Sequence, residues 1–148
     1  MQIDNVIAKG QLVPLVFMQA DVAASQSAAA LAVAEVRDTG ASADDQNAAG
    51  GYVMPFDGQV VAVTVRASTA RTAGTLTVDA QIGGTAVGLT AALNATDTQS
   101  KVSKQPREAD RFAAGAVIGA QITTDGSWAP VTADVVVVVW VLLELSGI

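Results

Sequence analysis

The sequence contains neither cysteine nor histidine among its 148 residues. Without cysteine, the chain has no disulfide framework and no thiolate that could act as a nucleophile or metal ligand. Without histidine, it lacks the commonest general base and the commonest metal ligand of enzymes. Serines are present, but no histidine or nucleophile-elbow motif accompanies them. We therefore expect no catalytic residues, no metal and no cofactor, and a protein that is not an enzyme.

Positive charge is also scarce. Eight Lys and Arg residues stand against fourteen Asp and Glu, which gives a net charge of −6 at pH 7. Such a balance opposes binding to nucleic acid or to an anionic membrane surface. The first ten residues, MQIDNVIAKG, do not show the charged and then apolar layout of a signal peptide. We expect neither a nucleic-acid partner nor a membrane partner.

Hydrophobic residues nevertheless make up 51% of the chain, and the densest run is at residues 135–143, VVVVVWVLL. This run is shorter than the roughly 20 residues of a membrane-spanning helix. Its β-branched valines favour a strand. One face of that strand carries the odd-numbered residues, and the other carries Val136, Val138, Trp140 and Leu142. Because both faces are apolar, we expect the core to cover one of them, and a loop, an arm or another subunit to cover the other.

Short strands separated by turn residues are predicted along most of the chain. Alternation of apolar and polar residues is clearest at residues 75–82, and it recurs at 59–68 and 117–124. At residues 59–68 the alternation places Val61 on one face together with Val63 and Val65, and Thr64 and Arg66 on the other. The expected number of strands is eight or nine, which predicts an all-β protein with an antiparallel β-sandwich or jelly roll.

Three local signals refine this prediction. Pro14 limits the strand at residues 11–19 to a sheet edge, a bulge or a strand start. Gly83-Gly84 is typical of a two-residue hairpin turn. Trp128 is predicted to pack over an open end of the sandwich, whereas Trp140 is either a core residue or an anchor in a subunit interface.

Residues 21–36 suit two structures. Their alanines favour a helix, yet the spacing of their apolar residues also suits a strand, which we favour because the chain after them is β. Residues 1–20 are predicted to be an N-terminal arm or first strand, and residues 21–148 a single sandwich domain. Ile3, Val6 and Ile7 are the apolar residues with which such an arm would contact a neighbour.

Half of the eight basic residues fall between positions 101 and 111, as Lys101, Lys104, Arg107 and Arg111. They could dock on an acidic partner or on phosphates. They could equally keep an edge strand soluble and prevent strand-to-strand aggregation, which we favour. Single-stranded nucleic acid would also require interleaved aromatic residues, and only Phe112 is near.

Two pairs of carboxylates are candidates for a metal site or for acid–base catalysis. Asp44 and Asp45 are adjacent, but no calcium-loop pattern surrounds them, so a solvated loop is favoured. Glu108 and Asp110 could serve as acid and base, although charged residues in such a loop more often form surface ion pairs.

Two segments carry a resemblance to a known family. They are GYVMPFDGQVVAVTVRASTARTAGTLTVDAQIGGTAVGLTAAL and DRFAAGAVIGAQITTDGSWAPVTADVVVVVWVLLEL, and together they span roughly residues 50 to 146. The chain resembles the jelly-roll virion proteins of tailed bacteriophages. The shared layout has an aromatic-x-x-Pro strand, a D/N-G turn, the AGTLTV strand, a glycine hairpin and a closing hydrophobic strand. A further shared element appears here as Phe112-Ala-Ala-Gly-Ala116, in which Ala116 takes the place of the family's usual acidic turn residue.

The resemblance implies a non-enzymatic particle protein. It implies a head decoration (cement) protein that binds the outside of a phage head and bridges subunits of the major capsid protein, commonly as a trimer. Such a protein is made in the host cytoplasm and ends in the virion. The alternative is a jelly-roll module of a head fibre, collar or tail fibre. That module would recognise host glycan through residues such as Tyr52 and Trp128.

Overall fold

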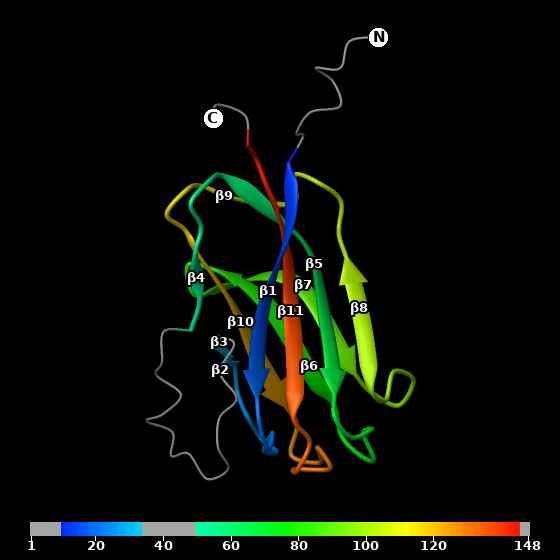
Figure 1. The fold of residues 1–148 in the computed structure, drawn as a ribbon. Coiled ribbons are helices and arrows are strands. Elements are labelled where there is room, and N and C mark those ends of the chain that lie inside the picture. The colour runs from blue at the N-terminus through cyan, green and yellow to red at the C-terminus, as the bar shows by residue number, and fades with distance from the viewer. Residues whose placement is uncertain (1–9, 34–49, 146–148) are drawn as a thin grey trace.

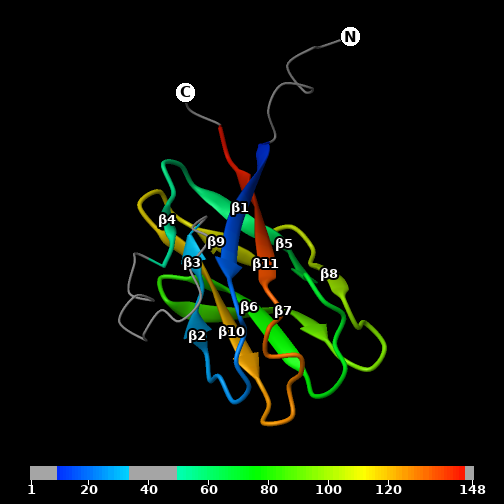
Figure 2. The ribbon, with the colours of Figure 1, turned by 60° about the horizontal axis from the view of Figure 1, so that its bottom comes forward.

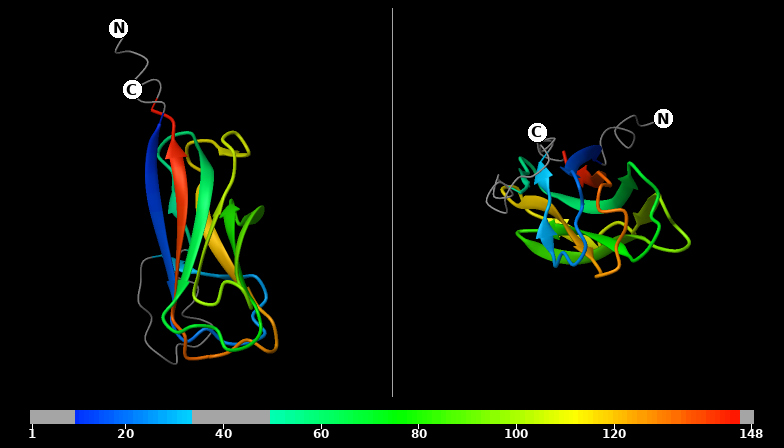
Figure 3. Two further views of the ribbon diagram at one scale, coloured as in Figure 1. Left: turned by 90° about the vertical axis from the view of Figure 1, so that its right-hand side faces the viewer. Right: turned by 90° about the horizontal axis from the view of Figure 1, so that it is seen from below.

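The computed structural model describes residues 10–33 and 50–145. Within these ranges the chain forms eleven strands and no helix (Figure 1). No helix there meets the length and hydropathy that crossing a membrane requires. The strands form two antiparallel sheets that lie face to face as two layers (Figure 3). The all-β antiparallel sandwich predicted from the sequence is therefore confirmed.

Each layer has a simple strand order. Sheet A, which faces the viewer in Figure 1, runs β3 (Ala32–Val33), β1 (Gln11–Gln19), β11 (Val135–Leu143), β5 (Gly58–Ala67) and β8 (Ser100–Lys104), with β9 (Asp110–Phe112) also on β5. Sheet B, whose order is easiest to follow in Figure 2, runs β2 (Ala29–Ala30), β10 (Val117–Thr124), β6 (Leu76–Ile82) and β7 (Thr85–Leu93), with β4 (Tyr52–Val53) also on β10.

The strand pairs are nested along the chain. β1 pairs with β11, β2 with β10, β5 with β8, and β6 with β7, all antiparallel. The first long strand thus pairs with the last, and each later pair lies inside the previous one, which is the arrangement of a jelly roll. It brings both ends of the described chain, Gly10 and Leu145, to the same end of the sandwich (Figure 1).

The core lies between the sheets and is lined by alternate residues of each strand. The odd-numbered residues of β11 from Val135 to Val141 are fully buried, so the core covers this one of the two apolar faces. Phe17 and Val63 flank them on the neighbouring strands of sheet A. The largest contributions from sheet B are Leu76, Val78, Ile118 and Ile122. Burial of each such side chain contributes about 1.5–3 kcal/mol, so this apolar layer is the main source of stability.

The sequence-based prediction for Val61 is wrong. The register between β5 and β11 shifts between Trp140 and Val141: Trp140 pairs with Ala62, but Val141 pairs with Val60. Val61 is the extra residue of a β-bulge, and it is only partly buried. Because the bulge reverses the alternation, Val60 takes the core position and is fully buried.

The other local predictions agree with the structure. Gly83 and Gly84 form the turn of the β6–β7 hairpin, with φ angles of 59° and 79°, which only glycine adopts freely at two successive positions. Residues 21–33 contain β2 and β3 and no helix, so the strand is confirmed there; residues 34–36 lie outside the described ranges. Pro14 lies in the part of β1 that pairs only with β11, so it lies on a sheet edge.

Trp128 closes the end of the sandwich opposite to Gly10. Its indole N–H donates to the carbonyl oxygen of Val22 at 3.1 Å, and only 2% of the residue is exposed. It therefore packs over an open end of the sandwich, as the sequence predicts.

The bulge leads to a test by paired substitutions. Val60→Ala should lower the free energy of unfolding by about 2 kcal/mol, because it leaves a cavity in the core. The control Val61→Ala, which removes the same atoms from a partly exposed position, should cost less than about 1 kcal/mol. Urea unfolding with an unchanged m-value measures both. Equal losses, or a larger loss for Val61→Ala, would contradict the bulge.

Candidate functional site

The outer face of sheet A is largely apolar, and the described chain leaves much of it exposed. On β11 the even-numbered Val136, Val138 and Trp140 are half-buried, although no other described element packs over them. We call this surface the apolar face. Its residues are Leu12, Pro14, Val16 and Met18 on β1, Val136, Val138, Trp140 and Leu142 on β11, Ala62 and Thr64 on β5, and Val102 on β8.

Strand register gathers these side chains on one surface. On β1, Val16 pairs with Val138 and Pro14 with Trp140. On the other side of β11, Trp140 also pairs with Ala62. Directly paired residues of neighbouring strands point to the same side of a sheet. The interface candidates Val136, Val138 and Trp140 are thus brought together with apolar residues that the sequence-based prediction did not select.

The outer face of sheet B has the opposite character. A hydrogen-bonded row of polar side chains crosses three of its strands. The Thr90 hydroxyl donates to Asp79 at 2.5 Å, and the Gln121 amide donates to the second oxygen of Asp79 at 3.1 Å. The Gln81 amide in turn donates to Gln121 Oε1 at 2.7 Å. These groups form a polar surface that suits contact with water, and the exposed pair of Val53 and Val117 lies at one end of the same sheet.

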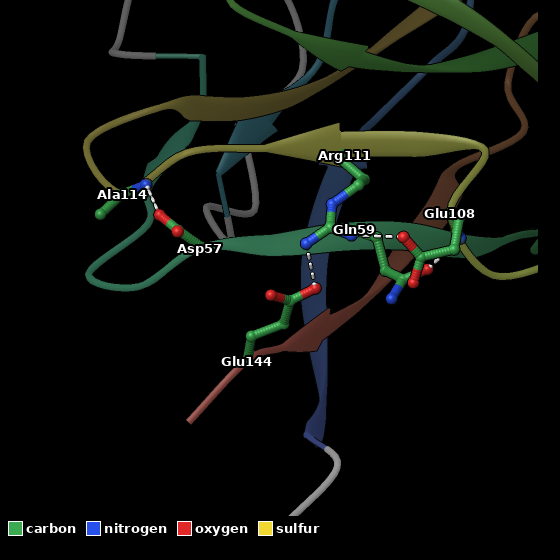
Figure 4. Close-up of polar contacts among 6 residues, drawn as sticks. All are labelled: Asp57, Gln59, Glu108, Arg111, Ala114 and Glu144. Carbon is green, nitrogen blue, oxygen red and sulfur yellow. Dashed lines mark hydrogen bonds and ion pairs between the residues drawn. The ribbon is translucent and has the colours of Figure 1, made fainter. Parts of the chain in front are cut away.

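A charged cluster lies at the end of the apolar face that is nearest to Gly10 and Leu145 (Figure 4). Arg111 lies between Glu108, with which it forms an ion pair, and Glu144, at 2.7 Å. Gln59 Oε1 accepts the backbone N–H of Glu108 at 2.6 Å. Beside Gln59 on the next strand, Leu142 is only 8% exposed, so this interface candidate offers little free surface.

The same cluster changes the electrostatics of Arg111. The hydrogen bond and the charge of Glu108, followed by the charge of Glu144, raise the pKa of the Arg111 guanidinium above its ordinary value. Because this pKa is raised, any stabilisation that the cation provides is fully present below the ordinary arginine pKa. It is lost only as the pH rises through the raised pKa. Arg111 therefore stays charged at physiological pH. Because Glu108 pairs with it, the ion-pair interpretation of that carboxylate is confirmed.

The four basic residues near position 105 do not form one patch. Lys101 pairs with Asp97 at 2.7 Å, and Arg111 is paired as described above. Lys101 and Lys104 lie on β8, an edge strand of sheet A, which agrees with the favoured role of keeping an edge soluble. Lys104 and Arg107 are exposed.

The aromatic residues considered for glycan recognition have structural roles. Trp128 is buried. The Tyr52 hydroxyl donates to the Val16 carbonyl at 3.0 Å, and its ring packs edge-on against Phe17 with a centroid distance of 5.5 Å. Trp128 is therefore inaccessible to a sugar, and Tyr52 is held by its contacts with β1.

Other sequence-based candidates give no site. Asp110 accepts a hydrogen bond from Gln105 at 2.6 Å, whereas Asp44, Asp45 and the arm residues Ile3, Val6 and Ile7 lie outside the described ranges. Within residues 10–33 and 50–145, no group of three or more His, Cys, Asp or Glu side chains could hold a metal ion.

Sequence reasoning missed the part of the apolar face that β1 supplies. The signal was present in QLVPLVFMQ, where both alternating sets of residues are largely apolar, as in β11. Val102 was missed because it stands alone among polar residues, and only its pairing with Thr64 places it on the face.

No family model matches the chain, and no curated protein matches its sequence.

The position of Trp140 can be tested against that of Trp128. Trp128→Phe should lower the free energy of unfolding by about 2 kcal/mol, because it removes a buried hydrogen bond and leaves a cavity. Trp140→Phe should cost less than about 1 kcal/mol when urea unfolding is measured at low protein concentration, since its side chain lies on an outer face. A larger loss for Trp140→Phe would show that Trp140 belongs to the protomer's own core.

Proposed function

We propose that this chain is a structural virion protein: a decoration (cement) protein that binds the outside of a phage head as a trimer. Its partner is the major capsid protein, and it acts by bridging neighbouring capsid subunits. It is made in the host cytoplasm and resides on the head surface. It performs no catalysis and requires no cofactor.

The observation that carries this proposal is the contrast between the two outer faces. A small sandwich with a polar, hydrogen-bonded face on sheet B and an apolar face on sheet A has one side suited to water and one suited to protein. Exposed apolar patches of several hundred Å² on soluble proteins commonly mark interaction sites. Binding by extended surfaces is the activity that this arrangement supports best.

The jelly-roll strand order adds support. Jelly rolls occur in viral capsid proteins and also in lectins and enzymes, so the fold alone does not select a function. The sequence features shared with phage virion proteins lie on the elements of this jelly roll. The AGTLTV segment leads into β6, the glycine pair makes the β6–β7 turn, and the hydrophobic run is β11. The burial of Trp128 and the contacts of Tyr52 favour decoration over the glycan-binding alternative.

The proposed mechanism is mass action. A protein that binds the assembled shell but not its free subunits lowers the free energy of the assembled state. Each copy that touches two capsid subunits contributes a small stabilisation, and many copies over one head add up. Apolar strand surface would supply the contact between copies of the trimer, and an N-terminal arm would supply contact area with capsid subunits.

Purified protein should bind heads assembled without it, from the phage whose genome encodes this chain. Binding should saturate and raise the temperature at which the heads lose their DNA, because only the intact shell presents the bridging site. Thermal release assays with increasing protein, together with electron microscopy, measure this. Copies confined to a single vertex would instead support the fibre or collar alternative, and absence of binding would contradict both.

A chain that lacks residues 1–9 should keep its fold and lose head binding. All of the described strands begin after these residues, so thermal unfolding of the truncated chain should resemble that of the full chain. Removal of the arm should remove its contacts with capsid subunits, and co-sedimentation with heads measures that loss. Full affinity of the truncated chain would refute the role of the arm.

A further inference from the structure

We infer that the apolar face of sheet A is the surface through which copies of this chain bind one another, packed around an axis roughly parallel to its strands. The occupant of the face is therefore a second copy. This inference deepens the self-association in the proposed function, and it identifies the surface that the copies share.

The face supplies the centre of such a contact. Outward side chains on a sheet are spaced by about 4.8 Å across strands and 6.6 Å along them, so the eleven residues of the face have a footprint of roughly 350 Å². This is less than the roughly 800 Å² that each partner buries in a stable interface, so residues on the border of the face contribute to the contact as well. Contact with both neighbours around the axis would use its whole width.

The edges of sheet A are poorly suited to pairing with another copy. On the β1 edge, Pro14 has no N–H to donate, and the Val16 carbonyl already accepts the Tyr52 hydroxyl at 3.0 Å. The opposite edge, β8, carries Lys101 and Lys104, which oppose the approach of another strand. Since extension of sheet A is blocked on both sides, association through this sheet would use its face.

Charge on the border of the face is complementary at one end of the strands. Arg66, which pairs with Val136, and Lys104, which pairs with Ala62, lie on the β5–β8 side, and both are exposed. Asp21 and Asp134 lie together at the ends of β1 and β11, where the Asp21 N–H donates to Asp134 Oδ1 at 3.1 Å. Around an axis parallel to the strands, the β5–β8 side of one copy meets the β1 side of the next. Arg66 lies near the same end of the strands as Asp21 and Asp134, so it then faces these carboxylates, whereas Lys104 lies level with Pro14 and faces no acidic residue; the centre of the contact is apolar.

Two exposed positions on the face and one matched control test the inference. Leu12 is 54% exposed and Val102 57% exposed, so neither Leu12→Glu nor Val102→Glu should disturb the fold. Val131, in the β10–β11 connection, is 51% exposed and lies away from the face. Each face variant introduces a charge that the contact would desolvate, and should weaken self-association by about a hundredfold. The control Val131→Glu should leave it unchanged.

Light scattering after size exclusion, over a series of concentrations, measures the mass of the isolated full-length chain and its variants. The expected result is an oligomer for the unchanged chain and for Val131→Glu, and dissociation for the two face variants. A monomer at all concentrations would overturn the inference, as would an oligomer that both face variants leave intact.

Tryptophan fluorescence gives a second readout that does not depend on mass. Trp128 is buried in the protomer, so acrylamide should quench mainly Trp140. In the associated chain Trp140 should be shielded, and the face variants should increase quenching severalfold; unchanged quenching would also overturn the inference. Because these measurements use isolated protein, they separate self-association from the proposed binding to heads, which can fail independently.

Discussion

The fold depends on the pairing of β11 with β1 on one side and with β5 on the other. These two ladders place the odd-numbered valines of β11 against sheet B, where they are fully buried. A pleated strand that buries one set of side chains must turn the alternate set outward. Since β11 is apolar throughout, the same pairing that builds the core also creates an apolar outer surface. Core and candidate interface are two sides of one strand.

Such a strand cannot define its own register. A slip by one residue would exchange the two faces of β11 and still bury valine. The neighbouring strands resolve this ambiguity. β5 carries Thr64 and Arg66 on its outward side and Val63 and Val65 on its inward side, so a slip of β5 would bring polar groups into the core and its own orientation is fixed. The bulge at Val61 then adjusts the register beyond Trp140, where β9 also pairs with β5.

The outer surfaces of the two sheets differ in polarity. Sheet B satisfies its outward polar groups within a row of side-chain hydrogen bonds around Asp79 and Gln121. Sheet A combines blunted edges with an apolar centre, and a charged cluster around Arg111 marks one end of it. A molecule built in this way is suited to binding by broad surfaces.

The sequence by itself determined the β character of the chain, the turn at Gly83-Gly84 and the apolar character of both faces of β11. These features depend on local preference and on a period of two, which neighbouring residues specify. Tertiary structure decided the core position of Val60 and the membership of Leu12 and Val102 in the apolar face. It also decided the burial of Trp128 and the pairing of Arg111 with Glu144. Those outcomes depend on which strands become neighbours and in which register, and pairing between residues far apart in the chain leaves no local pattern from which to read it.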